Sequence, residues 1–187
     1  MNKKILSIIR KKNNTKIVSL SAYSKNVAEI IDNHCDIVLV GDSLGSVLYN
    51  YKSTREVSLD TMIEHSKSVR LGVKKSLMVV DMPFNTYATK KSALKNAKKI
   101  IKETKCDALK LEGGKKIYEI IKNLVKNDIP IMGHLGVLPQ SAKNFKRSKI
   151  TGNCRCFFNG IRMHRKLAGK GYYKTNQNPN HWYRSLK

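Results

Sequence analysis

Five short apolar runs, each ending in a cluster of polar side chains, constrain this sequence more than any other feature. Segments with apolar residues at helical spacing separate the runs. Runs rich in Val, Ile and Leu in such a context predict parallel strands that are buried on both faces. The sequence therefore predicts strands and helices that alternate in one sheet, joined by right-handed crossovers. The runs are KIVSLSAY (16–23), IVLVGDS (37–43), SLMVVDMPF (76–84), ALKLEGG (108–114) and IPIMGHLG (129–136).

The segments between these runs are expected to form amphipathic helices. Ser58 is a good candidate for the N-cap of one of them. Another has Val27, Ile30 and Ile31 at helical spacing, which predicts a buried apolar stripe. A basic segment at the start of the sequence is expected to be a helix that leads into the first strand, rather than a signal peptide. The four connecting helices are expected over residues 24–34, 58–70, 90–104 and 115–128.

The length of 187 residues suits one domain with a sizeable core. Five strands in about 135 residues is the spacing of a (β/α)8 barrel, which typically needs about 250 residues. We therefore expect an incomplete barrel of about five parallel β/α units in residues 1–146. An irregular basic tail is expected at 147–187, where residues 151–187 contain no acidic residue and show no strand or amphipathic-helix pattern.

The formal net charge of +24 raises the question of a nucleic-acid partner. Lysines are spread along the chain on the polar faces of the expected helices, and no basic stripe is interleaved with aromatic residues. This distribution is typical of a solvated surface, so we expect no specific nucleic-acid binding. The apolar runs are far too short for a membrane span. The four cysteines form no secreted disulfide framework, which favours a reducing cytoplasm.

Three of the 13 acidic residues stand at the carboxyl ends of predicted strands: Asp42, Asp81 and Glu112. Active sites of α/β barrels and open α/β sheets lie at this edge. Carboxylate oxygens are hard donors that suit Mg²⁺, which takes few protein carboxylates and keeps several waters. Each acid alone is better explained as the cap of a turn. Three at equivalent strand ends favour a metal site in an enzyme.

Three more polar residues lie near the same strand ends. Ser43 either hydrogen-bonds a bound acid or turns the chain. Lys110 is two residues before Glu112, so both side chains point to one face of the strand. A lysine in a barrel mouth is costly unless paired, which favours a role in a substrate or metal site. His134 either contacts substrate or is a hydrogen-bonded structural histidine.

The motifs KIVSLSAY, GDSLG, VDMPF, DALKLEGG and PIMGHLGVLPQS, in this order and spacing, resemble those of the ketopantoate hydroxymethyltransferase family. The resemblance covers roughly residues 3–146. One departure is Ser24, where the family commonly has an aspartate. The family is a Mg²⁺-dependent (β/α)8 barrel of pantothenate biosynthesis. It transfers a one-carbon unit from 5,10-methylenetetrahydrofolate to 3-methyl-2-oxobutanoate.

This resemblance implies roles for the candidate residues. Asp42 and Asp81 would hold Mg²⁺, with Glu112 reaching the ion directly or through water. Ser43 and Lys110 would hold the keto acid, and the two metal-binding aspartates and His134 would also adjoin it. The implied partners are a small 2-oxo acid and a folate, in a cytoplasmic homo-oligomer for the intact family member.

The resemblance also implies a general-base glutamate in a Leu-Glu-Cys-Val-Pro-like strand, which this sequence lacks. The catalytic residue is therefore unknown, and the 187-residue chain is expected to be inactive. Without the later strands the barrel cannot close, so the first and fifth strands are expected to be exposed edges.

The unusual sequence of the tail can be explained by a shift of the reading frame. A one-nucleotide frame shift across residues 178–186 permits Ile-Pro-Thr-Ile-Gly-Ile-Gly-Ala, which resembles a later strand of the family. We hypothesise that residues from about 150 onward are an out-of-frame translation, with a deletion shortly before them. The tail residues Cys154, Cys156, His164 and His181 fit no standard zinc-site spacing, and we interpret them as accidental.

Two other functions stay open from the residues. One is another Mg²⁺-dependent barrel aldolase or lyase that acts on 2-oxo acids. The other is a basic protein that binds RNA or acidic surfaces, for which salt-dependent binding would be the mark.

Overall fold

The computed structural model describes residues 2–11, 14–135, 140 and 155–159. The helices are α1 (Lys3–Lys11), α2 (Lys25–Ile31), α3 (Leu44–Leu48), α4 (Leu59–Gly72), α5 (Lys90–Thr104) and α6 (Tyr118–Lys126), with short 3₁₀ turns η1 (Thr54–Glu56) and η2 (Gly114–Ile117). The strands are β1 (Ser19–Ser21), β2 (Ile37–Val40), β3 (Leu77–Asp81), β4 (Ala108–Glu112), β5 (Ile131–Leu135) and β6 (Arg155–Asn159).

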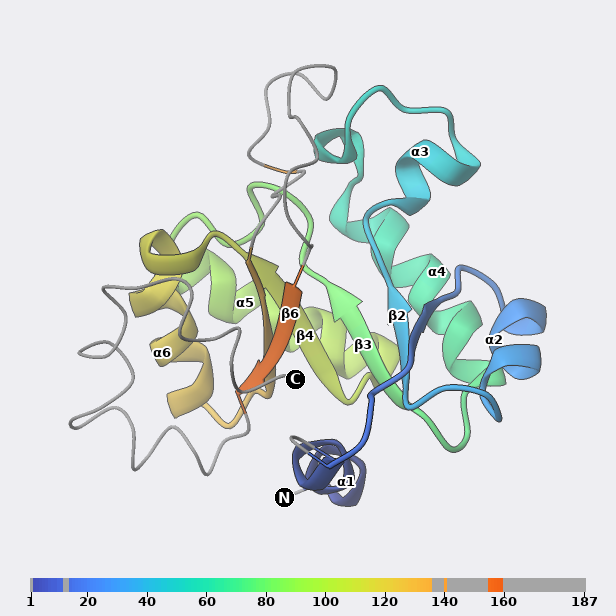
Figure 1. Ribbon diagram of the computed structural model, residues 1–187. Helices are drawn as coiled ribbons and strands as arrows, with labels where there is room; N and C mark the ends of the chain where they lie inside the picture. The colour runs from blue at the N-terminus through green and yellow to red at the C-terminus, as the bar shows by residue number, and fades with distance from the viewer. Residues whose placement is uncertain (1, 12–13, 136–139, 141–154, 160–187) are drawn as a thin grey trace.

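The strands form one sheet in the order β1-β2-β3-β4-β5-β6 (Figure 1). β1 to β5 pair in parallel, with Leu20 beside Val38 and Val80 beside Leu109. A helix lies in the connection between each parallel pair, and Ser58 caps α4 by accepting a hydrogen bond from the backbone of Thr61. The predicted alternation is confirmed, and the arrangement is that of five β/α units of an incomplete barrel.

β6 departs from the prediction. It lies in the basic tail, where the sequence predicts no strand, and it pairs antiparallel with β5, with Met132 opposite Phe158. The expectation that the fifth strand is an exposed edge is therefore wrong as well. The open side of β5 offers unpaired backbone groups, and the Cys-Phe-Phe segment at 156–158 has high strand propensity. The segment RCFFN shows neither an alternation of apolar and polar residues nor an apolar run as long as those of the predicted strands.

β1 lies at the other side of the sheet, and its three residues are all exposed. The expectation of a first strand at an edge is confirmed, whereas the expectation that it is buried on both faces is wrong. In the described part of the chain, β1 pairs only with β2. Leu20 and the preceding Ile17 and Val18 are consequently among the exposed large apolar side chains.

Helix α2 also buries a different face from the one predicted. Val27 and Ile30 are 45% and 70% exposed, whereas Ala28 is fully buried and Ile31 is partly buried against the core. α2 packs closely on α4, where a Cβ added to Gly72 would lie 2.4 Å from a carbonyl oxygen of α2. Ala28 is on that contact face. The predicted stripe is wrong because the helix is held by a small-residue contact rather than by its larger apolar side chains.

The two faces of the sheet pack against different partners. Apolar side chains on the outer face, the one covered by the connecting helices, pack with residues of α2, α4, α5 and α6 in the larger apolar cluster. The inner face carries Val79 and Ala108, which pack with Ile5 and Ile8 of α1. α1 therefore covers the inner face near the strand starts (Figure 1). Lys110 lies on the same inner face as Ala108, because alternate residues of a strand share a face. Since α1 covers only the strand starts, the opposite end of this face is left for polar groups.

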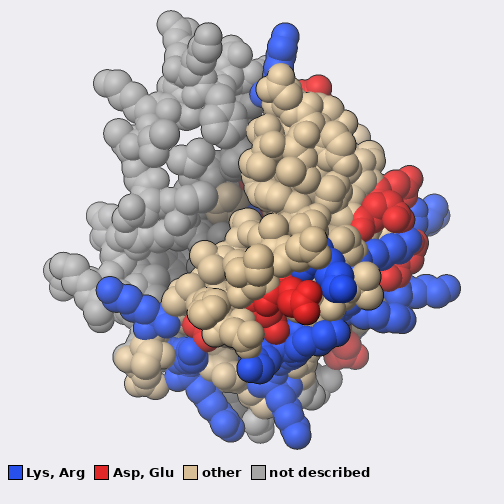
Figure 2. Space-filling model, turned by 90° about the vertical axis from the view of Figure 1, so that its right-hand side faces the viewer, with Lys and Arg blue, Asp and Glu red and all other residues tan. Residues whose placement is uncertain are grey.

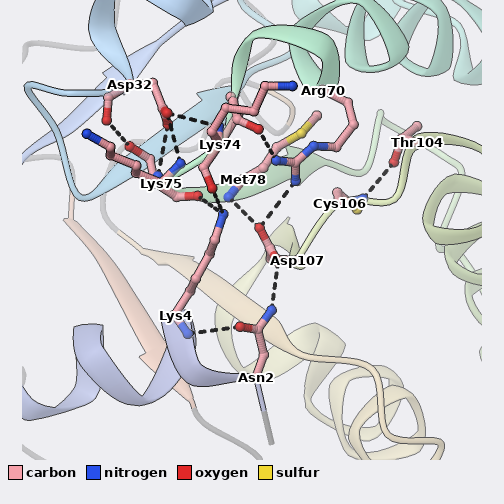
Figure 3. Close-up of polar contacts among 12 residues, drawn as sticks. Asn2, Lys4, Asp32, Arg70, Lys74, Lys75, Met78, Thr104, Cys106 and Asp107 are labelled. Atoms are coloured by element: carbon pink, nitrogen blue, oxygen red, sulfur yellow. Dashed lines mark hydrogen bonds and ion pairs between the residues drawn. The ribbon is translucent and has the colours of Figure 1, made fainter.

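A network of polar contacts fixes the starts of the strands (Figure 3). The Asp32 carboxylate accepts hydrogen bonds from the backbone N–H groups of Lys74, Lys75 and Ser76 at 2.9, 2.8 and 2.9 Å. Lys4 Nζ of α1 donates to the carbonyl oxygens of Lys74 and Ser76 at 2.9 and 2.8 Å. These contacts tie α1 and the end of α2 to the segment that enters β3.

Asp107 joins the same region of the fold from the start of β4. Its carboxylate accepts hydrogen bonds from the backbone N–H of Met78 at 2.9 Å and from Asn2 Nδ2 at 2.6 Å. Arg70 of α4 forms an ion pair with it at 3.6 Å and also donates to the carbonyl of Val73. One carboxylate thus links α1, α4 and two strands.

Replacing Asp32 by alanine is expected to lower the free energy of unfolding by about 2–4 kcal/mol, because three N–H groups lose a charged acceptor. Burial raises the pKa of Asp32, but the three backbone N–H groups outweigh it and hold the pKa below its ordinary value. The contribution is therefore present above about pH 4 and disappears as the pH falls through the lower native pKa.

Urea unfolding at pH 7 and at lower pH measures this effect. Asp60→Ala is the matched control, since Asp60 is an exposed acid that forms a surface ion pair with Lys99, and its loss is expected to have little effect on stability. Equal losses in the two variants would contradict the role assigned to Asp32.

The basic surface is interrupted by acidic side chains. Figure 2 shows Lys and Arg side chains interleaved with Asp and Glu on the face it presents. Exposed ion pairs join Lys67 to Glu64 and Lys90 to Glu119 at 2.8 and 3.0 Å. Among the described residues, no helix is both long and apolar enough to cross a membrane.

Candidate active site

Five predicted site residues lie buried at the carboxyl ends of neighbouring strands. The pairing register sets Asp81 of β3 beside Lys110 of β4, and Glu112 of β4 beside His134 of β5. Asp42 directly follows β2 and is also buried. Strand register therefore brings together side chains that are up to 92 positions apart in the sequence, from 42 to 134.

Asp81 is the centre of this cluster. Lys110 Nζ donates to its Oδ1 at 2.5 Å, and the backbone N–H of Asp42 donates to its Oδ2 at 3.1 Å. The pair is almost fully buried, since the side chain of Lys110 is 10% exposed and that of Asp81 is 4% exposed. This ion pair gives Lys110 the partner that a buried lysine needs.

Asp42 has an unfavourable electrostatic environment. Burial and then the nearby charge of Asp81 raise the pKa of Asp42 to about 6, against opposing effects of a hydrogen bond from Gln140 and the charge of Lys110. Glu112 contributes a further, smaller rise. The charges of two further acids therefore act on Asp42, with Lys110 opposing them, and a bound cation would relieve this repulsion.

Glu112 and His134 are neighbours across the β4–β5 pair. His134 Nδ1 lies 3.3 Å from Glu112 Oε2, and both side chains are buried. The other carboxylate oxygen of Glu112 accepts a hydrogen bond from the backbone N–H of Gln140 at 2.6 Å. The contact with Glu112 leaves both predicted roles of His134, in structure and in substrate binding, available.

Ser43 differs from the other site residues because it is exposed. Its hydroxyl lies 2.8 Å from the Tyr23 hydroxyl, and it makes no side-chain cap of α3. Ser43 thus lies at the exposed margin beside Asp42, just after the end of β2.

Two functional candidates were absent from the predicted set: Gln140 and Tyr87. Gln140 Nε2 donates to Asp42 Oδ2 at 2.7 Å and to the Met82 carbonyl at 3.1 Å. The Tyr87 hydroxyl donates its single proton to Gln140 Oε1 at 2.5 Å, and the same hydroxyl oxygen lies 3.1 Å from the Glu112 carbonyl oxygen. The signal available in the sequence was the PIMGHLGVLPQS motif, which contains Gln140 but assigns it no position.

The buried aspartates of the cluster are the residues that could hold a metal ion. The described part of the chain contains no group of three or more His, Cys, Asp or Glu side chains that is arranged to hold a metal ion. A pair of carboxylates nevertheless suits a hard divalent cation such as Mg²⁺, which binds few protein carboxylates. Asp42 and Asp81 lie at adjacent strand ends, both are buried, and their negative charges repel.

Comparison with known sequences decides the family. The sequence model described as ketopantoate hydroxymethyltransferase matches residues 3–159. This chain belongs to the ketopantoate hydroxymethyltransferase family. The match extends past the quoted motifs into β6.

Curated relatives in the ketopantoate hydroxymethyltransferase family carry the name 3-methyl-2-oxobutanoate hydroxymethyltransferase. The protein of Pelagibacter ubique (strain HTCC1062) is 76% identical over 146 residues, which are 78% of this chain and 57% of that protein. The Rhizobium etli protein (strain ATCC 51251 / DSM 11541 / JCM 21823 / NBRC 15573 / CFN 42) is 52% identical over 128 residues, 68% of this chain and 47% of that protein. The chain thus spans about half the length of these relatives.

Solved structures share the fold at low sequence identity. Two crystal forms of 2,3-dimethylmalate lyase, a member of the PEP mutase/isocitrate lyase superfamily, match with TM-scores of 0.51 and 0.53 at 13% and 11% identity. The matches cover 70% and 79% of this chain, and 53% and 56% of the lyase chains. They support the barrel-type fold of this family member.

Proposed function

We propose that this chain carries the part of a 3-methyl-2-oxobutanoate hydroxymethyltransferase that binds the metal and the keto acid. The reaction transfers a hydroxymethyl group from 5,10-methylenetetrahydrofolate to 3-methyl-2-oxobutanoate and gives 2-dehydropantoate for pantothenate biosynthesis. The observation that carries the proposal is the buried cluster of Asp42, Asp81 and Lys110 at the carboxyl ends of β2, β3 and β4.

The proposed cofactor is Mg²⁺, with Asp42 and Asp81 as protein ligands and Glu112 reaching it through water. When bound, the ion would supply Lewis-acid polarisation of the keto oxygen. Few carboxylates are needed because Mg²⁺ keeps several waters or substrate oxygens. The mutual repulsion of the two buried aspartates supports this assignment.

The remaining residues are proposed to hold the substrate. Lys110 Nζ donates a hydrogen bond to Asp81. It would provide positive charge where negative charge develops on the keto oxygen. Ser43 presents a hydroxyl at the exposed margin of the cluster and would donate to the substrate carboxylate. His134 would contact the substrate from β5 while its Nδ1 stays beside Glu112. We also propose a cytoplasmic, homo-oligomeric assembly for the intact family member.

Asp42→Asn tests the proposed metal site. The variant is expected to lose Mn²⁺ affinity by more than about 100-fold, since it removes a ligand rather than an outer partner. It is also expected to stabilise the metal-free protein at pH 7 by about 1–3 kcal/mol. A raised pKa of about 6 means that the ionised Asp42 destabilises the fold. That penalty is absent below the unfolded pKa of about 4 and is complete above the native value.

Calorimetric titration with Mn²⁺ and urea unfolding at pH 5 and pH 7 measure the two effects. Asp60→Asn is the control, because this exposed acid lies on α4 and pairs with Lys99 rather than with a residue of the cluster. Wild-type Mn²⁺ affinity in Asp42→Asn would refute the site. A panel of 2-oxo acids, with and without Mg²⁺, separates hydroxymethyl transfer from the aldolase or lyase alternative.

We also propose that residues 1–146 are the barrel part and that 147–187 derive from out-of-frame translation. The match to the Pelagibacter relative covers 146 of the 187 residues, so 41 residues of this chain lie outside it, which supports a divergent tail. The family match reaches residue 159, so the gene sequence must decide between a boundary near residue 146 and one after β6. Sequencing the gene tests the proposal. An intact frame across codons 145–155, with no alternative frame that encodes the later family strands, would overturn it.

A further inference from the structure

We propose that Gln140 is a positioning residue, which fixes the carboxylates of Asp42 and Glu112 relative to one another for the bound cation. The inference rests on the metal site proposed above. It adds a residue that makes no contact with the ion and acts through two acids of the site. The contacts of its side chain and of its backbone carry the argument separately.

The orientation of the Gln140 amide is determined by its surroundings. Tyr87 donates to Oε1, and the Met82 carbonyl accepts from Nε2. A carbonyl oxygen only accepts hydrogen bonds, so the nitrogen end must face Met82 and therefore also Asp42. The side chain is buried, which leaves it little freedom to turn. Asp42 Oδ2 is consequently held by a donor of fixed direction at 2.7 Å.

The Gln140 backbone is held as firmly as the side chain. Its N–H donates to Glu112 Oε1 at 2.6 Å, and its carbonyl oxygen accepts from Arg55 Nε at 2.6 Å. The Arg55 guanidinium in turn lies 4.3 Å from the ring centre of Phe84, a favourable cation–π arrangement. All four polar atoms of Gln140 thus have partners, which come from the end of β4 and from the segments that follow β2 and β3.

This arrangement leaves the cluster able to accept a cation. Gln140 occupies one oxygen of Asp42 and one of Glu112 with neutral donors, so it adds no positive charge that would compete with the ion. Hydrogen-bonded ligands hold a fixed direction, and loss of such an outer partner typically costs about 10–100-fold in metal affinity. A residue that only joined loops would have no such effect on affinity.

Gln140→Met tests the inference, because methionine keeps the length of the side chain but removes its donor and acceptor. The measurement is Mn²⁺ affinity by calorimetry, with the midpoint of thermal unfolding recorded for the metal-free protein. We expect the Mn²⁺ dissociation constant to rise about 10–100-fold. Tyr87→Phe should raise it less, since it removes only the group that orients the amide. Adding Tyr87→Phe to Gln140→Met should cause no further rise.

Asn96→Ala is the matched control. Asn96 Nδ2 donates to the Thr86 carbonyl at 2.6 Å, so its loss loosens the same β3–α5 connection without touching a carboxylate. It should lower the unfolding midpoint and leave Mn²⁺ affinity unchanged. Wild-type affinity in Gln140→Met, with a lowered midpoint, would overturn the positioning role alone. Equal Mn²⁺ binding by wild type and Asp42→Asn would instead overturn the metal site, and this inference with it.

Discussion

Purified as the 187-residue chain, the protein is expected to form 2-dehydropantoate about 10²–10⁴-fold more slowly than the Pelagibacter ubique relative. The family resemblance assigns proton abstraction to a glutamate in a Leu-Glu-Cys-Val-Pro-like strand, and the sequence contains no such segment. A positioned base contributes a factor of this size. The cluster of Asp42, Asp81 and Lys110 would bind and polarise the keto acid but would not remove its proton.

The measurement is product formation with saturating Mg²⁺, keto acid and methylene-folate, run beside the relative. The control is the relative in which the glutamate that the family resemblance implies as the base is replaced by glutamine, and it should fall to a similar rate. Retained Mn²⁺ binding by the 187-residue chain would show that the loss lies in proton transfer rather than in folding. A rate within about tenfold of the intact relative would contradict the assignment of the base.

Lys110→Met is expected to lower the free energy of unfolding by about 3–5 kcal/mol. The substitution leaves Asp81 buried without its cation, and Asp42 then faces a second carboxylate with no compensating charge. Urea unfolding of the metal-free protein at pH 7 measures the loss. It should shrink at pH 4, because Asp42, whose pKa is raised to about 6, is then protonated and no longer repels Asp81.

The double variant Lys110→Met/Asp81→Asn provides the control for this prediction. Replacing both charges removes the uncompensated carboxylate, so the double variant should be more stable than Lys110→Met alone. A second check is Mn²⁺, which should stabilise Lys110→Met more than wild type because it supplies the missing positive charge. If the single and double variants were equally unstable, loss of packing rather than loss of charge would explain the effect.

Much of the fold could be predicted because its signals are local. Helix periodicity and the Ser58 cap located the connecting helices, and the apolar runs located five parallel strands. Alternation of side chains along β4 also placed Lys110 and Glu112 on one face, since strand geometry has a period of two. Strand ends then located the polar cluster, because parallel strands end at a common edge.

Other features depended on contacts that the sequence pattern does not contain. Val27 and Ile30 were predicted to be buried, but Ala28 makes the close contact with α4. Gln140 is 98 residues from Asp42 in the sequence, and only the folded chain sets its amide against that carboxylate.

The sequence by itself determined the order of the β/α units and the acids at their carboxyl ends. The tertiary structure alone decided which apolar faces are covered, that β6 pairs with β5, and that Gln140 bridges Asp42 and Glu112. The physical reason is that periodicity shows which side of an element is apolar or polar. It does not show which distant segment packs there or which hydrogen-bond partner that segment brings.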